Sequence, residues 1–115
     1  MTDRERLPRS HRLVRGPDVH LVLRSGRRAR RAHLDIFWTP SEAGHSRLGL
    51  IVPRFQHSAV ARNRLRRRLK DLWRRELRPG LPASDVVFRA RKESYGASFA
   101  TLRAELTGWV ATLQP

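Results

Sequence analysis

Residues 58–78 read SAVARNRLRRRLKDLWRRELR, and the fold can be worked out from this stretch. Its apolar residues recur at the 3-, 4- and 7-residue spacings of one helix face. They are Leu65, Leu69, Leu72, Trp73 and Leu77. Ser58 can accept a hydrogen bond from an N–H of the first turn, and Pro79 and Gly80 end the helix because proline lacks a donor and glycine turns freely. The stretch therefore predicts an amphipathic helix that docks on a core.

The same helix carries nine Lys or Arg against only Asp71 and Glu76. At about 100° per residue these cations form three ribbons. The ribbon opposite the apolar stripe consists of Arg67, Arg74 and Arg78. A second ribbon, on one flank, consists of Arg64, Arg68 and Arg75. The third ribbon lies on the flank that borders the stripe and consists of Arg62, Arg66 and Lys70. A helix face that only meets water usually mixes both signs, because unpaired like charges destabilise a helix. The ribbons therefore indicate a polyanionic partner.

The composition also favours a nucleic-acid partner. The chain has 115 residues, no cysteine and a formal net charge of +15, which favours binding to phosphate backbones through counterion release. The length predicts one RNA-binding domain, residues 1–115, with residues 1–15 as a flexible basic arm. No signal peptide and no apolar run of about 20 residues is recognisable, so we expect a cytoplasmic protein without a membrane partner. Nothing in the pattern implies a stable protein partner.

The remaining periodicities predict an α+β fold in the order α-β-β-β-α-β-α, with helices packed on a small, mostly antiparallel sheet. A short helix begins at Gly16 and ends at Ser25, and residues 27–31 form a basic loop or short strand. Three strands follow from period-2 alternation, of which the first two should pair as an antiparallel hairpin. They are residues 33–39, 47–53 and 85–91. A last helix begins at Ser98. Its apolar stripe consists of Phe99, Leu102, Leu106, Trp109, Val110 and Leu113.

The chain lacks the residue pattern that RNA cleavage by a protein requires. Such cleavage needs clustered carboxylates that hold a divalent metal, or a positioned general acid and base. The ten Asp and Glu are scattered along the chain, and the five histidines lie 9 to 13 residues apart, which is not metal-ligand spacing on a helix. We therefore predict no catalytic residue, no metal site and no cofactor motif in the protein.

The tripeptide Arg62, Asn63, Arg64, followed by the basic amphipathic helix, resembles the signature of the protein subunit of bacterial ribonuclease P. The flanking segments LGLIV, residues 48–52, and SDVVFRAR, residues 84–91, are similar to the strands that precede and follow the signature helix in that family. The similarity covers residues 7–113. It implies a two-layer sandwich like a ribosomal-protein domain, with a left-handed β-α-β crossover.

The resemblance also implies a division of labour. Ribonuclease P removes the 5′ leader from precursor tRNA, and its RNA subunit carries the catalytic magnesium ions while the small basic protein assists. This chain is then expected to be the accessory subunit of an endoribonuclease. Its partners would be the catalytic RNA and precursor tRNA, and catalysis would come from the RNA.

Carried over by position, the resemblance implies two RNA-binding surfaces. The signature helix would contact the catalytic RNA through Arg62, Asn63, Arg64, Arg67, Arg68 and Arg74. A cleft for the single-stranded leader would be lined by Val19, Leu23, Phe37, Arg54, Arg66 and Lys70. The position of Arg66 and Lys70 beside the apolar stripe agrees with the second assignment.

Two departures from the family pattern affect this cleft. Family members usually have aromatic residues where this chain has Val19 and Leu23, so Phe37 is the cleft residue expected to stack on a base. A typical Ser-Lys-Lys is replaced by Pro-Arg-Phe at residues 53–55, and Phe55 is either a further aromatic of this surface or a core residue. We expect charge and apolar contact to hold the leader.

Two other functions share some of these features. A ribosomal or other structural RNA-binding protein has a similar size and charge, but it does not require an Arg-Asn-Arg tripeptide between two strands. An autonomous nuclease is disfavoured by the scattered carboxylates. The identity of the RNA that the protein binds in the cell separates these alternatives.

Overall fold

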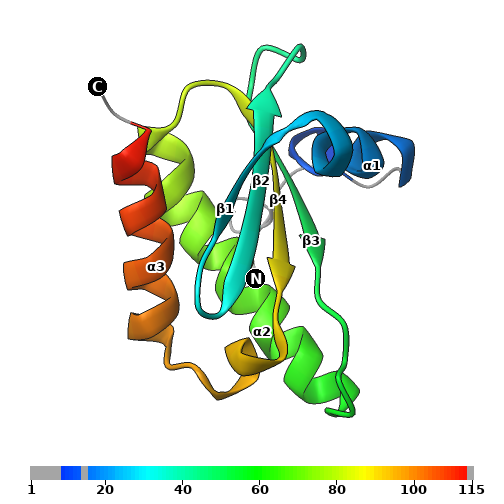
Figure 1. Ribbon diagram of the computed structural model, residues 1–115, viewed down its shortest axis with the longest axis vertical. Helices are drawn as coiled ribbons and strands as arrows, with labels where there is room; N and C mark the ends of the chain where they lie inside the picture. The colour runs from blue at the N-terminus through cyan, green and yellow to red at the C-terminus, as the bar shows by residue number, and fades with distance from the viewer. Residues whose placement is uncertain (1–8, 14–15, 114–115) are drawn as a thin grey trace.

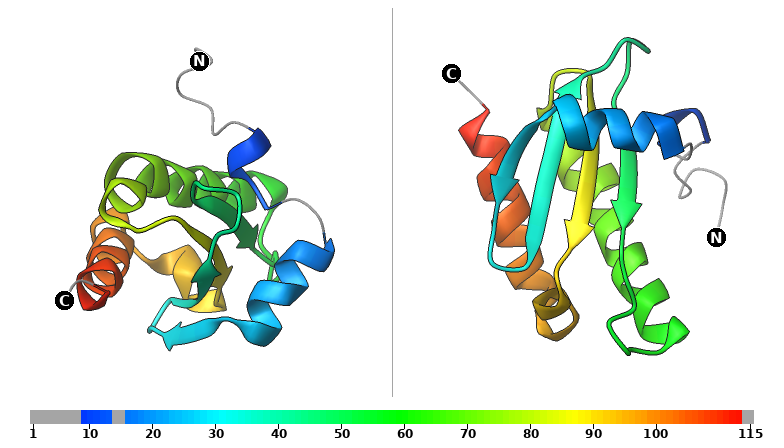
Figure 2. Two further views of the ribbon diagram at one scale, coloured as in Figure 1. Left: turned by 90° about the horizontal axis from the view of Figure 1, so that it is seen from above. Right: turned by 45° about the vertical axis from the view of Figure 1, so that its right-hand side comes forward.

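A computed structural model describes residues 9–13 and 16–113 of the chain. It is an α+β fold in which two helices cover one face of a four-stranded sheet and one helix crosses the other face (Figures 1 and 2). The helices are α1 (Gly16–Ser25), α2 (Ala59–Leu72) and α3 (Phe99–Thr112), and the strands are β1 (Arg27–Arg30), β2 (Leu34–Pro40), β3 (Arg47–Ile51) and β4 (Ser84–Ala90). The predicted fold class and order of elements are confirmed. None of the described helices is long and apolar enough to span a bilayer.

The order of strands in the sheet is β1-β2-β4-β3, so the predicted hairpin of β2 and β3 is wrong. Strand β4 lies between them, antiparallel to β2 and parallel to β3, with Phe37 opposite Val87 and Leu50 opposite Phe88. Alternation of apolar residues assigns side chains to the two faces of a sheet, but it does not identify the neighbouring strand. As a result β3 is an edge strand.

The connection from β3 through α2 to β4 joins two parallel strands. In Figure 1 both strands point downward, α2 lies behind them, and β3 lies to the right of β4. Seen from the helix side with the strands pointing upward, β4 is therefore to the left of β3, which makes the crossover left-handed. Because about 98% of such crossovers are right-handed, this is an unusual feature of the fold, and it agrees with the family resemblance.

The sheet separates two hydrophobic cores. The larger core lies between the sheet and the helices α2 and α3, where Phe88 contacts Trp73 and Trp109 edge to face with ring centroids 5.9 and 6.1 Å apart. Helix α2 and the turn that follows it, Trp73–Leu77, together contribute the whole predicted stripe to this core. The smaller core, formed by Leu13, Val22, Phe37 and Val87, lies between the sheet and α1.

The predicted starts of both long helices are confirmed. Ser58 Oγ accepts a hydrogen bond from the backbone N–H of Ala61 at 3.1 Å, and Ser98 Oγ accepts one from Thr101 at 3.0 Å. The apolar stripe of α3 is confirmed for its buried members Leu102, Leu106 and Trp109. It is wrong for Phe99, whose side chain is 39% exposed at the first turn of the helix.

Part of the predicted flexible arm is docked on the sheet. Residues Arg9–His11 form a 3-10 turn, and the backbone N–H of Leu13 donates to the carbonyl oxygen of Leu48 at 2.9 Å. Leu13 is buried in the smaller core. The prediction of an arm that is flexible up to residue 15 is therefore wrong for residues 9–13, and the rest of that arm lies outside the described residues.

The tight packing of α1 against β2 predicts a large effect of substituting Gly26. A Cβ at this position would lie 2.5 Å from the carbonyl oxygen of Val22 and 2.7 Å from that of Trp38, and backbone atoms cannot give way as a flexible side chain can. We expect Gly26→Ala to lower the free energy of unfolding by about 1–3 kcal/mol in denaturant titrations. Gly108→Ala is the control, since that site is open and alanine favours a helix interior by about 0.5–1 kcal/mol. Equal stability of the two variants would contradict the close approach at Gly26.

Candidate nucleic-acid interface

The flank of α2 next to the edge strand β3 carries a row of cations. Arg62 Nε donates a hydrogen bond to the carbonyl oxygen of Val52, 2.7 Å away, which holds this side chain at the end of β3. Arg66 and Lys70 follow at i+4 and i+8 on the same flank. Arg12 approaches Lys70 from the segment that pairs with β3, and its Nε is buried without a hydrogen-bond partner in the described chain. We refer to Arg12, Arg62, Arg66 and Lys70 as the basic flank.

Within residues 9–13 and 16–113, no acidic residue forms an ion pair with the basic flank. Residues 58–70 contain no Asp or Glu, and the two acids further along the helix pair with Arg74, Arg75 and Arg103. Burial is the main cause that lowers the pKa of Lys70, and the positive charges of Arg66 and Arg12 lower it further. The pKa of Arg66 is likewise lowered by burial and by Arg62. Such cations are destabilised until an anion approaches, so the flank is suited to bind phosphate groups.

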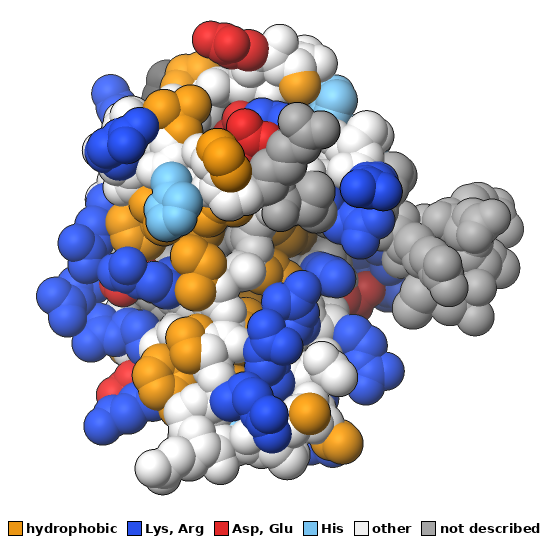
Figure 3. Space-filling view, turned by 90° about the vertical axis from the view of Figure 1, so that its right-hand side faces the viewer, with side chains coloured by type: hydrophobic (Ala, Val, Ile, Leu, Met, Phe, Trp, Pro, Cys, Tyr) orange, Lys and Arg blue, Asp and Glu red, His pale blue; other side chains and the backbone are white. Residues whose placement is uncertain are grey.

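Figure 3 shows the molecule from the β3 side. Lys and Arg side chains form a column down the middle of this face, with hydrophobic side chains to either side. With a rise of 1.5 Å per residue, Arg62 and Lys70 lie about 12 Å apart along α2. The basic flank can therefore neutralise more than one phosphate of an extended strand.

The solvent-facing side of α2, which continues to the flank away from the basic flank, presents a second basic surface, which we name the outer face. Asn63, Arg64 and Arg67 are exposed there, with Asn63 next to Lys70, and Arg68 is half-buried. Arg62, which the family resemblance assigns to the same surface, belongs to the basic flank instead because of its hydrogen bond to Val52. The predicted set for the catalytic RNA is therefore divided between two sides of the helix.

Arg74 is less exposed than its predicted position opposite the apolar stripe implies. After α2 the chain continues as a π-helix, Trp73–Leu77, in which the N–H of Arg78 bonds to the carbonyl oxygen of Trp73, five residues back. The extra residue in this turn interrupts the 100° step of an α-helix. The side chain of Arg74 is only 22% exposed and pairs with Asp71 at 2.9 Å. Its charge is already compensated, so the outer face is represented by Arg64 and Arg67.

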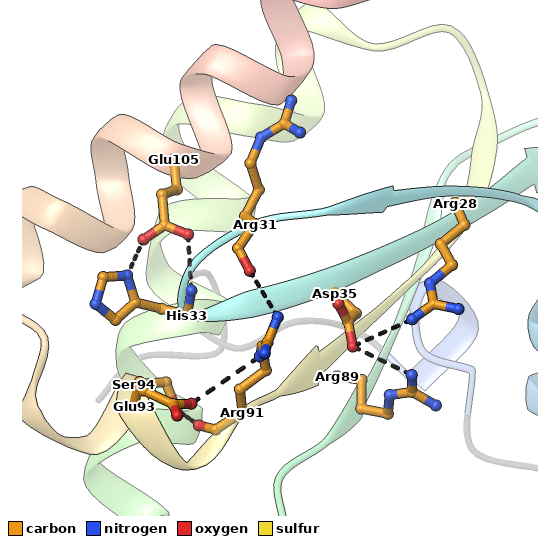
Figure 4. Close-up of polar contacts among 9 residues, drawn as sticks. All are labelled: Arg28, Arg31, His33, Asp35, Arg89, Arg91, Glu93, Ser94 and Glu105. Atoms are coloured by element: carbon orange, nitrogen blue, oxygen red, sulfur yellow. Dashed lines mark hydrogen bonds and ion pairs between the residues drawn. The ribbon is translucent and has the colours of Figure 1, made fainter.

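Phe37 lies on the other side of the sheet and does not offer a free ring for stacking. Its side chain is only 5% exposed, and the guanidinium carbons of Arg28 and Arg89 lie 5.5 and 4.9 Å from the ring centroid. Both guanidinium groups also approach Asp35, at 3.9 Å from Arg28 and 3.1 Å from Arg89 (Figure 4). The predicted stacking role of Phe37 is thus corrected, because these two guanidinium groups cover the ring.

The structure divides the residues of the predicted cleft into two groups. Val19 and Leu23 of α1 pack with Phe37 in the smaller core, whereas Arg66 and Lys70 lie on the α2 side of the edge strand β3. Residues 12–13 connect the groups, since Leu13 belongs to the smaller core and Arg12 lies beside Lys70. The sequence analysis missed Arg12 because a short polar segment has no periodicity that predicts where it docks.

Most carboxylates of the described residues are engaged in ion pairs, and none of them gathers with others into a metal site. Asp85 accepts two hydrogen bonds from Arg47 at 2.8 and 2.7 Å, and Glu105 of α3 binds the backbone and ring nitrogens of His33 (Figure 4). Within residues 9–13 and 16–113, no three His, Cys, Asp or Glu side chains gather to hold a metal ion. The arrangement suits the binding of a polyanion.

Comparison with known proteins gives a consistent match over the chain. The sequence model of a family described as Ribonuclease P matches residues 7–114. A ribonuclease P protein component from Syntrophobacter fumaroxidans is 36% identical over 100 residues, which cover 85% of this chain and 84% of that protein. The component from Acidothermus cellulolyticus is 36% identical over 101 residues, covering 86% and 84%.

The fold is similar to that of solved structures. The ribonuclease P protein from Thermotoga maritima superposes with a TM-score of 0.78 at 25% identity, covering 90% of this chain and 98% of that one. The protein from Staphylococcus aureus gives the same TM-score at 17% identity, which is a similarity of fold. The left-handed crossover and the basic helix thus occur in a chain that matches one family in sequence and structure.

The uncompensated charge of Lys70 predicts that its removal stabilises the free protein. Lys70→Gln removes a like-charge contact with Arg66, one turn away on the helix, so we expect the free energy of unfolding to rise by about 0.2–0.5 kcal/mol at low salt. The gain should shrink in about 1 M salt, where charges are screened within about 3 Å. Lys92→Gln, an exposed lysine of the 3-10 turn Lys92–Gly96, is the control. A loss of stability in Lys70→Gln at low salt would contradict the description of the flank.

Because the pKa of Lys70 is lowered in the folded protein, the contribution of Lys70 to stability should depend on pH. The ordinary pKa of a lysine is 10.5, and the pKa of Lys70 is lower than this in the folded protein. As the pH approaches 10.5, Lys70 therefore loses its proton in the folded protein before it does so in the unfolded chain. Stability therefore rises with pH through this window. The rise should be smaller in Lys70→Gln than in the unaltered protein, and denaturant titrations from pH 8 to about 10.5 measure the difference.

Proposed function

The chain belongs to the ribonuclease P protein family and is the protein subunit of this tRNA-processing endoribonuclease, and from this premise we propose how its two basic surfaces are used. The basic flank binds the single-stranded 5′ leader of precursor tRNA. The outer face of α2 binds the catalytic RNA. Together they hold the leader in a fixed position relative to the catalytic RNA.

The observation that carries this proposal is the uncompensated, partly buried charge of the basic flank. Arg66 and Lys70 have lowered pKa values because burial and neighbouring cations disfavour their charged forms. A structural ion-pair network would place acids here, as the chain does with Asp71 beside Arg74. Phosphates of a flexible single strand can follow the flank and restore the balance of charge, whereas a rigid duplex is less able to enter beside the edge strand.

Catalysis is assigned to the RNA subunit. The described residues provide no carboxylate cluster for magnesium, so the divalent ions of the reaction are expected to bind to the RNA. The protein contributes by neutralising phosphates, which reduces the repulsion between the catalytic RNA and its substrate.

The proposal predicts that the two surfaces can be separated by mutation. In holoenzyme reconstituted with the catalytic RNA, Arg66→Ala and Lys70→Ala should each weaken binding of precursor tRNA more than binding of mature tRNA, because only the precursor has a leader. We expect a loss of about 1 kcal/mol for each variant, or about fivefold in the dissociation constant. Equilibrium binding of both substrates at one fixed salt concentration provides the measurement.

The matched controls are Arg64→Ala and Arg67→Ala, which remove the same charge from the outer face of the same helix. They should weaken assembly with the catalytic RNA while the preference for precursor over mature tRNA stays unchanged in the assembled enzyme. If Arg66→Ala and Lys70→Ala affect precursor and mature tRNA equally, the basic flank does not bind the leader. Leader removal by the protein alone, free of RNA, would contradict the assignment of catalysis.

A further inference from the structure

Three aromatic side chains meet where the loop between β3 and α2 passes the 3-10 turn Lys92–Gly96. His57 stacks on Tyr95 with ring centroids 4.0 Å apart and an interplanar angle of 4°. Phe55 contacts Tyr95 edge to face at 6.5 Å and 84°. The hydroxyl of Tyr95 donates to the carbonyl oxygen of Pro53 at 2.7 Å, which fixes the tyrosine against the loop. We refer to Phe55, His57 and Tyr95 as the aromatic corner.

The backbone holds Phe55 in the corner at a conformational cost. Its side chain is 44% exposed, so it is not the core residue that the sequence left as one alternative. The φ angles of Phe55 and Gln56 are +48° and +70°, and the N–H of His57 closes the turn by donating to Arg54 O at 2.8 Å. Such a turn favours Asn and Gly, and a bulky residue with positive φ is strained. Strain that presents an apolar ring to solvent indicates a role in binding.

The aromatic corner lies next to the basic flank. Arg62, the end member of the flank, donates to the carbonyl oxygen of Val52, and the next residue, Pro53, accepts the hydrogen bond of Tyr95. Arg54, in the same turn, adds an exposed positive charge beside the rings. A strand whose phosphates follow Lys70, Arg66 and Arg62 is therefore led to the corner. In the outer face, Arg64 lies on the far flank of the helix, and Arg67 points away from the apolar stripe.

We propose that the aromatic corner is a stacking site for one unpaired base of the 5′ leader. This inference rests on the proposed function, because it extends the path of the leader from the basic flank. Aromatic side chains stack on any base, so the site detects the presence of a base rather than its identity. Phe55 and Tyr95 provide the rings, and Arg54 and Arg62 provide positive charge for the adjoining phosphates.

The first experiment compares Phe55→Asn with the unaltered holoenzyme. Asparagine tolerates positive φ, so this variant removes the ring and relieves the strain, and its thermal midpoint should be unchanged or higher. Affinity for leader-bearing precursor tRNA should fall about fivefold to a hundredfold, the usual effect of losing one stacked base, while affinity for mature tRNA stays constant. Phe99→Ala, which removes another exposed ring, at the start of α3, is the matched control and should leave both affinities unchanged.

A second experiment locates the base by removing leader bases one at a time as abasic nucleotides. With the unaltered holoenzyme, one position should lower the affinity by a similar factor, and the same substrate should show no further loss with Phe55→Asn. A scan that is flat, or that is identical for both proteins, would overturn the inference. So would a Phe55→Asn variant whose defect is confined to assembly with the catalytic RNA, since the base would then belong to that RNA.

The outcomes also distinguish this inference from the function on which it rests. If Arg66→Ala and Lys70→Ala lose the preference for precursor tRNA while Phe55→Asn keeps it, the basic flank binds the leader and the corner does not. If the unaltered holoenzyme shows no preference for a leader at all, the proposed function fails and the corner assignment fails with it.

Discussion

The structure depends on the burial of one stripe of α2 against the sheet, because this contact holds a dense set of like charges in place. Leu65, Leu69, Leu72 and Trp73 are at most 4% exposed, and full burial of such side chains contributes about 1.5–3 kcal/mol each. Each pair of like charges one turn apart costs only about 0.2–0.5 kcal/mol. Hydrophobic burial therefore exceeds the repulsion. The helix can keep its cations free for RNA without loss of the fold.

The sequence was sufficient to predict the features that depend on local periodicity. The apolar stripe of residues 65–77, the cap at Ser58 and the strand faces all agree with the structure. The left-handed crossover also agrees, but only the family resemblance implied it. The sequence was insufficient for features that depend on contacts between segments far apart in the chain. Strand β4 inserts between β2 and β3, and residues 9–13 dock on the edge strand, since pairing in a sheet is a tertiary choice among strands with similar patterns. The π-helix after Leu72 was not predicted either, because no residue in the sequence signals it.

The candidate site shows the same division. A helical wheel correctly placed Arg66 and Lys70 beside the apolar stripe, but it could not show that Arg12 joins them or that Arg62 bonds to Val52. Both of these unpredicted contacts involve β3 or the residue that follows it. Likewise, Phe37 is covered by Arg28 and Arg89 from neighbouring strands, while Phe55 is held in solvent by a strained turn. An exposed aromatic ring thus lies at the end of the basic flank, whereas the ring of Phe37 on the sheet is covered.

The proposed path of the leader runs along the basic flank, between the edge strand β3 and α2. The direct test is to place 4-thiouridine in the leader of precursor tRNA, irradiate the reconstituted holoenzyme, and identify the cross-linked peptides by mass spectrometry. We predict cross-links to peptides that contain residues 9–13 and 54–70. Cross-links confined to α3, Phe99–Thr112, on the other side of α2, would contradict the account.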